Sequence, residues 1–106
     1  MINITFNPKT FTLKVEGHAN HSKKGEDIVC AAISTLFYTL GECLMQSEEM
    51  LKSPPKFKDK DGNGFLCCKP KKEFEGNIAC TYWTILTGME LVASNYPDNV
   101  NFKVEG

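Results

Sequence analysis

The spacing of apolar residues changes four times along the chain, and this alternation limits the folds that the chain can adopt. Alternating apolar and polar residues in 2–6 and 11–15 predict two strands, and the same alternation in 100–104 predicts a final one. In 27–52 and 76–95 the apolar residues recur at helical spacing. These two segments therefore predict long helices.

Turn residues between these segments complete the pattern. Residues 7–10 join the first two strands into a hairpin, and residues 61–64 contain both Asp-Gly and Asn-Gly, which predict a second hairpin between 56–60 and 65–69. The Ser-Pro-Pro sequence at 53–55 ends the first helix, because proline lacks a backbone N–H. The expected order is ββαββαβ, a two-layer α/β (α+β) fold in which a mixed five-stranded sheet carries both helices on one face.

The composition is that of a single soluble domain spanning 1–106, with 42% hydrophobic and 24% charged residues. The first residues read as a strand rather than a signal peptide, and no apolar run approaches the roughly 20 residues that span a bilayer. The odd number of cysteines, five, favours a reducing compartment. We expect a cytoplasmic protein without a membrane partner.

The charge balance argues against direct nucleic-acid binding. Twelve lysines and no arginine face thirteen acidic residues, for a net charge of −1. A protein that reads bases without a guanidinium group for bidentate contacts would be unusual. The lysine-rich segments 56–60 and 69–72 are interpreted as a solvated or protected strand edge, with a basic patch that attracts a partner as the alternative.

The strongest functional signal lies where the first hairpin meets the first helix. Cys30 is expected in about the first turn of that helix, where unpaired N–H groups and the helix dipole favour a thiolate. His18 follows the second strand and is expected to accept the thiol proton and later protonate a leaving amine. Backbone N–H groups at the helix start are candidates for an oxyanion hole.

Two residues are candidates for supporting roles. Ser34 lies one turn after Cys30, so its hydroxyl either positions a water, the substrate or the histidine, or bonds back to the carbonyl of residue 30. Asp27 either caps the helix or orients His18.

The polar stretch 19–26 has two interpretations, a lid that closes over the thiol or an ordinary surface loop. The histidine in it is either solvated or a substrate contact. The candidate substrate-contact residues are Ala19, Asn20, His21 and Gly25.

A zinc site is the main competing interpretation for this segment, because imidazole and thiolate both bind zinc. His18, His21 and Cys30 supply three such groups, but the sequence points to no fourth ligand. We expect neither a metal nor a cofactor.

The other cysteines lack a nearby histidine in the sequence. Cys67 and Cys68 should point to opposite sheet faces, which places one in the core and the other at the surface or an interface. Cys43 and Cys80 are interpreted as small buried hydrophobes on the helices.

Residues 17–34 resemble the signature of the ribosomal-processing cysteine protease (Prp) family, and the expected order of elements matches the fold of that family. The matching positions are Gly17-His18-Ala19, Gly25, Asp27-Ile28-Val29-Cys30-Ala31-Ala32 and Ser34. Lys23-Lys24 departs from the commonest loop pattern of the family.

The resemblance implies a cysteine endopeptidase with Cys30 as nucleophile and His18 as general base. It also implies a homodimer, a loop at about 19–25 that closes over the peptide, and removal of a short N-terminal extension from a large-subunit ribosomal protein. Phage capsid or scaffold proteins are an alternative substrate class, and a non-catalytic assembly or binding module of the same fold is an alternative function.

Overall fold

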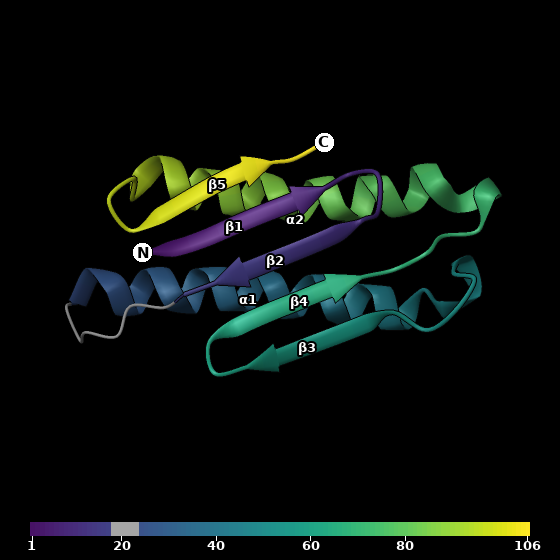
Figure 1. The fold of residues 1–106 in the computed structure, drawn as a ribbon, viewed down its shortest axis with the longest axis horizontal. Helices are drawn as coiled ribbons and strands as arrows, with labels where there is room; N and C mark the ends of the chain where they lie inside the picture. The colour runs from purple at the N-terminus through teal and green to yellow at the C-terminus, as the bar shows by residue number, and fades with distance from the viewer. Residues whose placement is uncertain (18–23) are drawn as a thin grey trace.

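The computed structural model describes residues 1–17 and 24–106, with side chains from residue 28 onward in the second range. The chain forms five strands and two long helices in the expected order ββαββαβ (Figure 1). The elements are β1 (Ile2–Asn7), β2 (Thr12–Glu16), α1 (Lys24–Gln46), β3 (Lys56–Lys60), β4 (Asn63–Cys67), α2 (Glu75–Asn95) and β5 (Val100–Val104), with short 3-10 turns at Glu48–Met50 and Lys72–Phe74.

The sheet is mixed, with strand order β3-β4-β2-β1-β5. β1 pairs in parallel with β5, and the other neighbouring strands pair antiparallel. Both helices lie along the same face of the sheet, behind the strands in the view of Figure 1. This arrangement confirms the fold class expected from the alternating periods.

The core lies between the sheet and the two helices. Every apolar position expected on the inner face of α1 is buried: Val29, Ile33, Phe37, Leu40 and Leu44. On α2, where the helical spacing of the sequence falls on Ile78, Tyr82, Ile85, Met89 and Val92, the first four are buried and Val92 is partly buried against the core. The opposite face of the sheet carries exposed polar residues such as Asn3, Lys14 and Asn101.

The first helix ends earlier than its apolar period indicates, at Gln46 rather than near residue 52. The reason is tertiary, because residues 50–52 pair with residues 69–71 through the bonds Lys52 N to Lys69 O and Lys71 N to Met50 O, both 2.8 Å. A chain that makes these bonds cannot continue an α-helix, so it passes through a 3-10 turn instead.

The second hairpin also differs in register from the expectation. The turn is Asp61-Gly62, with φ of 52° and 79°, and Lys60 pairs with Asn63. Positive φ at both central residues is the type I′ geometry that matches the twist of a hairpin. β4 therefore begins at Asn63, two residues before the expected start of that strand.

Helix α1 contains a 19-residue stretch, Ile28–Gln46, that is long and apolar enough to cross a membrane by length and composition alone. This finding corrects the expectation that no run approaches that length. A core helix of a soluble protein passes the same test. The inner face of this helix packs in the core described above, so its length and composition are only weak evidence for a membrane span.

Candidate active site

Cys30 is the seventh residue of α1, which begins at Lys24, and not a first-turn residue as the sequence indicated. The helix dipole acts mainly on the first turn, and only the first four N–H groups lack helical partners. The correction matters chemically, because neither the dipole nor an oxyanion hole built from the helix start lies at the thiol. Activation of this cysteine must come from other groups.

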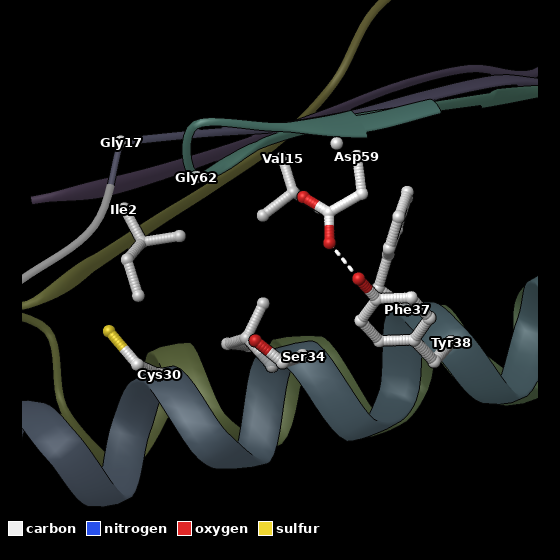
Figure 2. Close-up of a pocket in the computed structure, with 11 residues that line it drawn as sticks. Ile2, Val15, Gly17, Cys30, Ser34, Phe37, Tyr38, Asp59 and Gly62 are labelled. Carbon is white, nitrogen blue, oxygen red and sulfur yellow. Dashed lines mark hydrogen bonds between the residues drawn. The ribbon is translucent and has the colours of Figure 1, made fainter. Parts of the chain in front are cut away.

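The Cys30 side chain is half-buried and lines a cleft of about 220 Å³ between α1 and the sheet. Cys30, Ser34 and Tyr38 follow one another at one-turn intervals along the helical wall. Figure 2 shows the Cys30 sulfur pointing across the cleft toward the sheet. The remaining lining residues are Ile2, Val15, Gly17, Ile33, Phe37, Asp59, Gly62 and Gly64.

Two glycines allow the cleft walls to approach closely. A Cβ on Gly64 would lie 2.7 Å from the Phe37 ring, so only glycine lets β4 pack on α1 here. Gly17 has φ of 85°, and a Cβ there would lie 2.4 Å from the carbonyl oxygen of Met1. The Gly17 amide donates to Asn63 Oδ1 at 3.2 Å, which ties the end of β2 to the second hairpin.

Several predicted site residues lie outside the described residues. His18, Ala19, Asn20 and His21 belong to the segment 18–23, so neither the proposed thiol and imidazole pair nor the lid is tested.

Gly25 and Asp27 are placed only as backbone of α1, so a capping or orienting carboxylate at Asp27 also stays a prediction. What the structure brings together is Cys30, Ser34 and Gly17, the residue directly before His18 in the sequence.

The hydroxyl of Ser34 is exposed in the cleft. In the described part of the chain it makes no bond back to the carbonyl of residue 30, whereas Thr35 Oγ1 makes the equivalent bond to Ala31 O at 2.8 Å. Of the two roles weighed for Ser34, contact with a bound molecule is therefore the one that the geometry leaves open.

Tyr38 and Asp59 are cleft residues that the sequence reasoning missed. The Tyr38 hydroxyl donates a hydrogen bond to Asp59 Oδ2 across the cleft (Figure 2). Tyr38 lies two turns beyond Cys30 on α1, and this spacing is a signal that the sequence offered. Asp59 lies on β3, and nothing in the sequence links it to that helix.

The other cysteines follow the expectations only in part. Cys68 is buried and Cys67 is half-buried, which confirms their opposed environments. Cys43 is half-buried rather than buried, and Cys80 is exposed, so the prediction for Cys80 is wrong. The reason is helix phase: Cys80 lies two residues beyond Ile78 and two before Tyr82, which form the inner face of α2.

Two buried side chains outside the cleft lining, Cys68 and Tyr82, have raised pKa values. Burial raises the pKa of the Cys68 thiol, with a smaller opposing effect from its hydrogen bond with Tyr82. Burial also raises the pKa of the Tyr82 hydroxyl, whose oxygen lies 2.9 Å from Phe11 O and 3.5 Å from Cys68 Sγ. Both groups are therefore held in their neutral forms.

Within residues 1–17 and 24–106, no group of three or more His, Cys, Asp or Glu side chains is arranged to hold a metal ion. His18 and His21, the nitrogen ligands of the zinc interpretation, lie outside these ranges.

The chain resembles known proteins in sequence and in fold. The family model described as cysteine protease Prp matches residues 1–101. A crystal structure of the essential ribosomal processing protease Prp from S. aureus, in complex with a substrate peptide, superposes with a TM-score of 0.70 at 20% identity, covering 98% of this chain and 97% of that one.

The structure of SMU.848 from Streptococcus mutans also superposes with a TM-score of 0.70, at 23% identity, covering 97% of this chain and 90% of that one. At these identities the likeness to the two structures establishes the shared fold. A search of curated protein sequences finds no match.

Proposed function

The chain belongs to the Prp cysteine protease family, and on that premise we propose that Cys30 is its nucleophile and His18 its general base. The observation that carries this proposal is the cleft itself, because Cys30 and Gly17 line the same hollow and His18 is the next residue in the sequence. The end of β2 at this cleft therefore supports the proposed pairing, although twelve residues separate the two positions in the sequence.

The chemistry follows from these residue types. The imidazole takes the Cys30 proton, and the thiolate forms a bond to the carbonyl carbon of a peptide bond. The imidazolium returns the proton to the departing amine, which breaks the C–N bond and leaves a thioester on Cys30. Water, deprotonated by the same imidazole, then hydrolyses the thioester and restores the thiol.

Because the helix dipole does not reach Cys30, the proposed imidazolium carries most of the thiolate stabilisation. A cationic histidine beside a cysteine favours the thiolate form. The Ser34 hydroxyl, exposed one turn away in the same cleft, is suited to contact the substrate carbonyl or the hydrolytic water.

The proposed substrate is a large-subunit ribosomal protein with a short N-terminal extension, which the enzyme removes. Support comes from the family and from the S. aureus relative, which is a ribosomal processing protease bound to a substrate peptide. The cleft and a second hollow share Ser34 and Tyr38 on α1, so an extended peptide along this helix could contact both.

A homodimer in the cytoplasm is also proposed. The helix layer exposes large apolar side chains that a second copy could cover, including Ile28 and Met45 on α1 and Leu91 on α2, exposed by 61%, 50% and 60%. Among the described residues no disulfide is formed, which agrees with a reducing compartment.

The test is cleavage of the extended ribosomal protein from the same source, read by intact mass. The unmutated protein is compared with Cys30→Ala and with Cys80→Ala, a matched control that removes an exposed thiol outside the cleft lining. Loss of a defined N-terminal peptide with the unmutated protein and with Cys80→Ala, but not with Cys30→Ala, is the expected result. Turnover by Cys30→Ala would remove the proposal.

Thiol reactivity separates an enzyme that acts on another protein from a binding module. An activated Cys30 should react with iodoacetamide near pH 6, well before Cys80, although Cys80 is the more exposed of the two. If the extended protein stays intact but Cys30 reacts first, the search moves to phage structural proteins. Five similarly slow thiols would instead indicate a binding module.

A further inference from the structure

The end of the cleft away from Cys30 carries a carboxylate. Asp59 lies on the edge strand β3, on the same sheet face as Phe57 two residues earlier, because side chains alternate along a strand. The Phe57 ring packs against the Phe37 and Tyr38 rings of α1 at centroid distances of 5.1 and 5.5 Å. This packing holds β3 against the helix and keeps Asp59 over the cleft.

The Asp59 carboxylate is held in place by the hydroxyl of Tyr38 (Figure 2). No lysine in the described part of the chain forms an ion pair with it. The lysines of β3, Lys56, Lys58 and Lys60, alternate with Phe57 and Asp59 and so face the opposite side of the strand. The negative charge of Asp59 is therefore available to a bound molecule.

The described lining of the cleft is acidic, although the chain is nearly neutral overall. Asp59 is the only charged residue among the described residues that line the cleft. A second hollow of about 570 Å³ continues along α1, shares Ser34 and Tyr38 with the cleft, and has Glu42 as its only charged lining residue among those described. A substrate lying along α1 would meet two carboxylates and, within these linings, no cation.

The helical spacing sets where along a substrate this charge would act. Tyr38 lies eight residues after Cys30, a distance of roughly 12 Å at the rise of an α-helix. An extended peptide advances about 3.3 Å per residue, so a carboxylate at this distance meets a side chain about three or four residues from the scissile bond.

We propose that Asp59 and Tyr38 form a specificity subsite that takes a lysine or arginine side chain of the substrate, three or four residues from the bond that is cut. The inference rests on the proposed protease function. The carboxylate makes a charge-assisted hydrogen bond to the cation, and the Tyr38 ring offers a face for a cation–π contact. The Tyr38 hydroxyl bond orients the carboxylate, so Tyr38 is also a positioning residue.

The first experiment profiles cleavage in a peptide library made by digesting a bacterial proteome after glutamate, which leaves lysine and arginine inside the peptides. The unmutated protein, Cys30→Ala, Asp59→Asn and Asp61→Asn are compared by mass spectrometry. Asp61→Asn is the matched control, because Asp61 is a nearby carboxylate outside both linings. The expected result is no cleavage by Cys30→Ala, and enrichment of basic residues three or four positions from the cleaved bond that Asp61→Asn keeps and Asp59→Asn loses.

The second experiment measures kcat/KM on synthetic versions of the best peptide with Lys, Gln or Glu at that position. The unmutated protein should favour Lys over Gln by at least about tenfold, the lower end expected of one hydrogen bond to a charged group. Asp59→Lys should reverse the order and favour Glu, a result that a merely structural role for Asp59 cannot produce. Circular dichroism checks that each variant is folded.

The outcomes separate this inference from the proposed function. No cleavage of any peptide by the unmutated protein would remove the protease proposal and this inference with it. Cleavage that depends on Cys30 but shows no basic preference at those positions, or the same preference in Asp59→Asn, would overturn the subsite alone.

Discussion

Ser34 lies one helical turn after Cys30 on α1, and the two side chains line the same wall of the cleft. The Ser34 hydroxyl is exposed there, while three threonines of the same helix layer, Thr35, Thr39 and Thr84, bond back to carbonyls of their own helices. A hydroxyl that is not used by its helix can serve a substrate or a water molecule.

Ser34→Ala should therefore reduce kcat/KM by up to about tenfold. This is the loss expected when one hydrogen bond from an uncharged hydroxyl to the substrate or the water is removed. The thermal midpoint should stay close to that of the unmutated protein, since the residue is exposed. Thr84→Ala is the control, because its hydroxyl bonds to Cys80 O on α2, outside the cleft. Unchanged kinetics of Ser34→Ala on the cleaved peptide would leave Ser34 without a role.

The packing of β3 on α1 makes a second prediction. A Cβ on Gly41 would lie 2.4 Å from the Phe57 ring, and that ring is itself packed against Phe37 and Tyr38. The ring has little room to retreat, so Gly41→Ala should lower the free energy of unfolding by about 1–3 kcal/mol in urea denaturation.

Gly76→Ala is the matched control for Gly41→Ala. A Cβ on Gly76 would meet nothing within 4 Å, and the residue lies within α2. Alanine has the better helix propensity, so this variant should gain up to about 1 kcal/mol. Equal effects of the two substitutions would contradict the close contact between Gly41 and Phe57.

These contacts also show where sequence reasoning succeeds and where it stops. The inner face of α1 could be predicted because burial imposes a helical period on nearby residues, and Val29 to Leu44 obey it. The end of the same helix could not, because it is set by pairing between residues 50–52 and 69–71. The apolar spacing within one segment does not reveal which distant segment it will pair with.

The site follows the same division. Cys30 and Ser34 are neighbours on one helix, so their spacing alone places them on one face. The Tyr38 and Asp59 pair joins residues 21 apart in the sequence through the packing of β3 on α1, which only the fold reveals. The position of Cys30 within the helix was misjudged because Asp27, a residue type favoured at helix caps, suggested a helix start there, whereas α1 begins at Lys24.

The buried hydroxyl of Tyr82 makes a third prediction. It donates to the carbonyl oxygen of Phe11 at 2.9 Å, next to the first hairpin turn. Tyr82→Phe keeps the ring but leaves that carbonyl without this donor, which should cost about 1–2 kcal/mol of unfolding free energy. Tyr96→Phe is the control, because Tyr96 is exposed and should change stability little. Similar urea midpoints for both variants would contradict the role of the bond.

Alkaline pH should destabilise the protein through the same cluster. Burial raises the pKa of Cys68 and of Tyr82 in the folded state. In the unfolded chain these groups lose their protons near their ordinary values of about 8.5 and 10. Above those values the unfolded state binds fewer protons than the folded one, so the stabilising contribution present at lower pH is lost as pH rises.

The thermal midpoint should therefore fall as pH rises from about 8 to about 10.5, since both groups titrate in that window in the unfolded chain. Cys68→Ala removes one of the two groups and should make the decline shallower, whatever its effect on the midpoint at neutral pH. Parallel declines in the two proteins would show that other groups cause the pH dependence.

Gly17 provides the last prediction, because it combines an unusual backbone conformation with a place in the cleft. Its φ of 85° lies in the left-handed region, and a Cβ would meet the Met1 carbonyl oxygen at 2.4 Å. Gly17→Ala must therefore shift the end of β2, at a cost of about 1–3 kcal/mol in stability. Because Gly17 directly precedes His18 in the sequence, the same shift should also move the proposed base.

Activity should fall more than stability explains. At a temperature where Gly17→Ala is folded, kcat/KM should drop by at least about tenfold, since a small misplacement of a catalytic group is costly. Tyr82→Phe is the comparison, because it is expected to lose similar stability while its hydroxyl bonds to Phe11 O and Tyr82 lies outside the cleft lining. Equal activity in the two variants would mean that the exit of β2 does not set the position of His18, and the proposed pairing with Cys30 would then need another geometric basis.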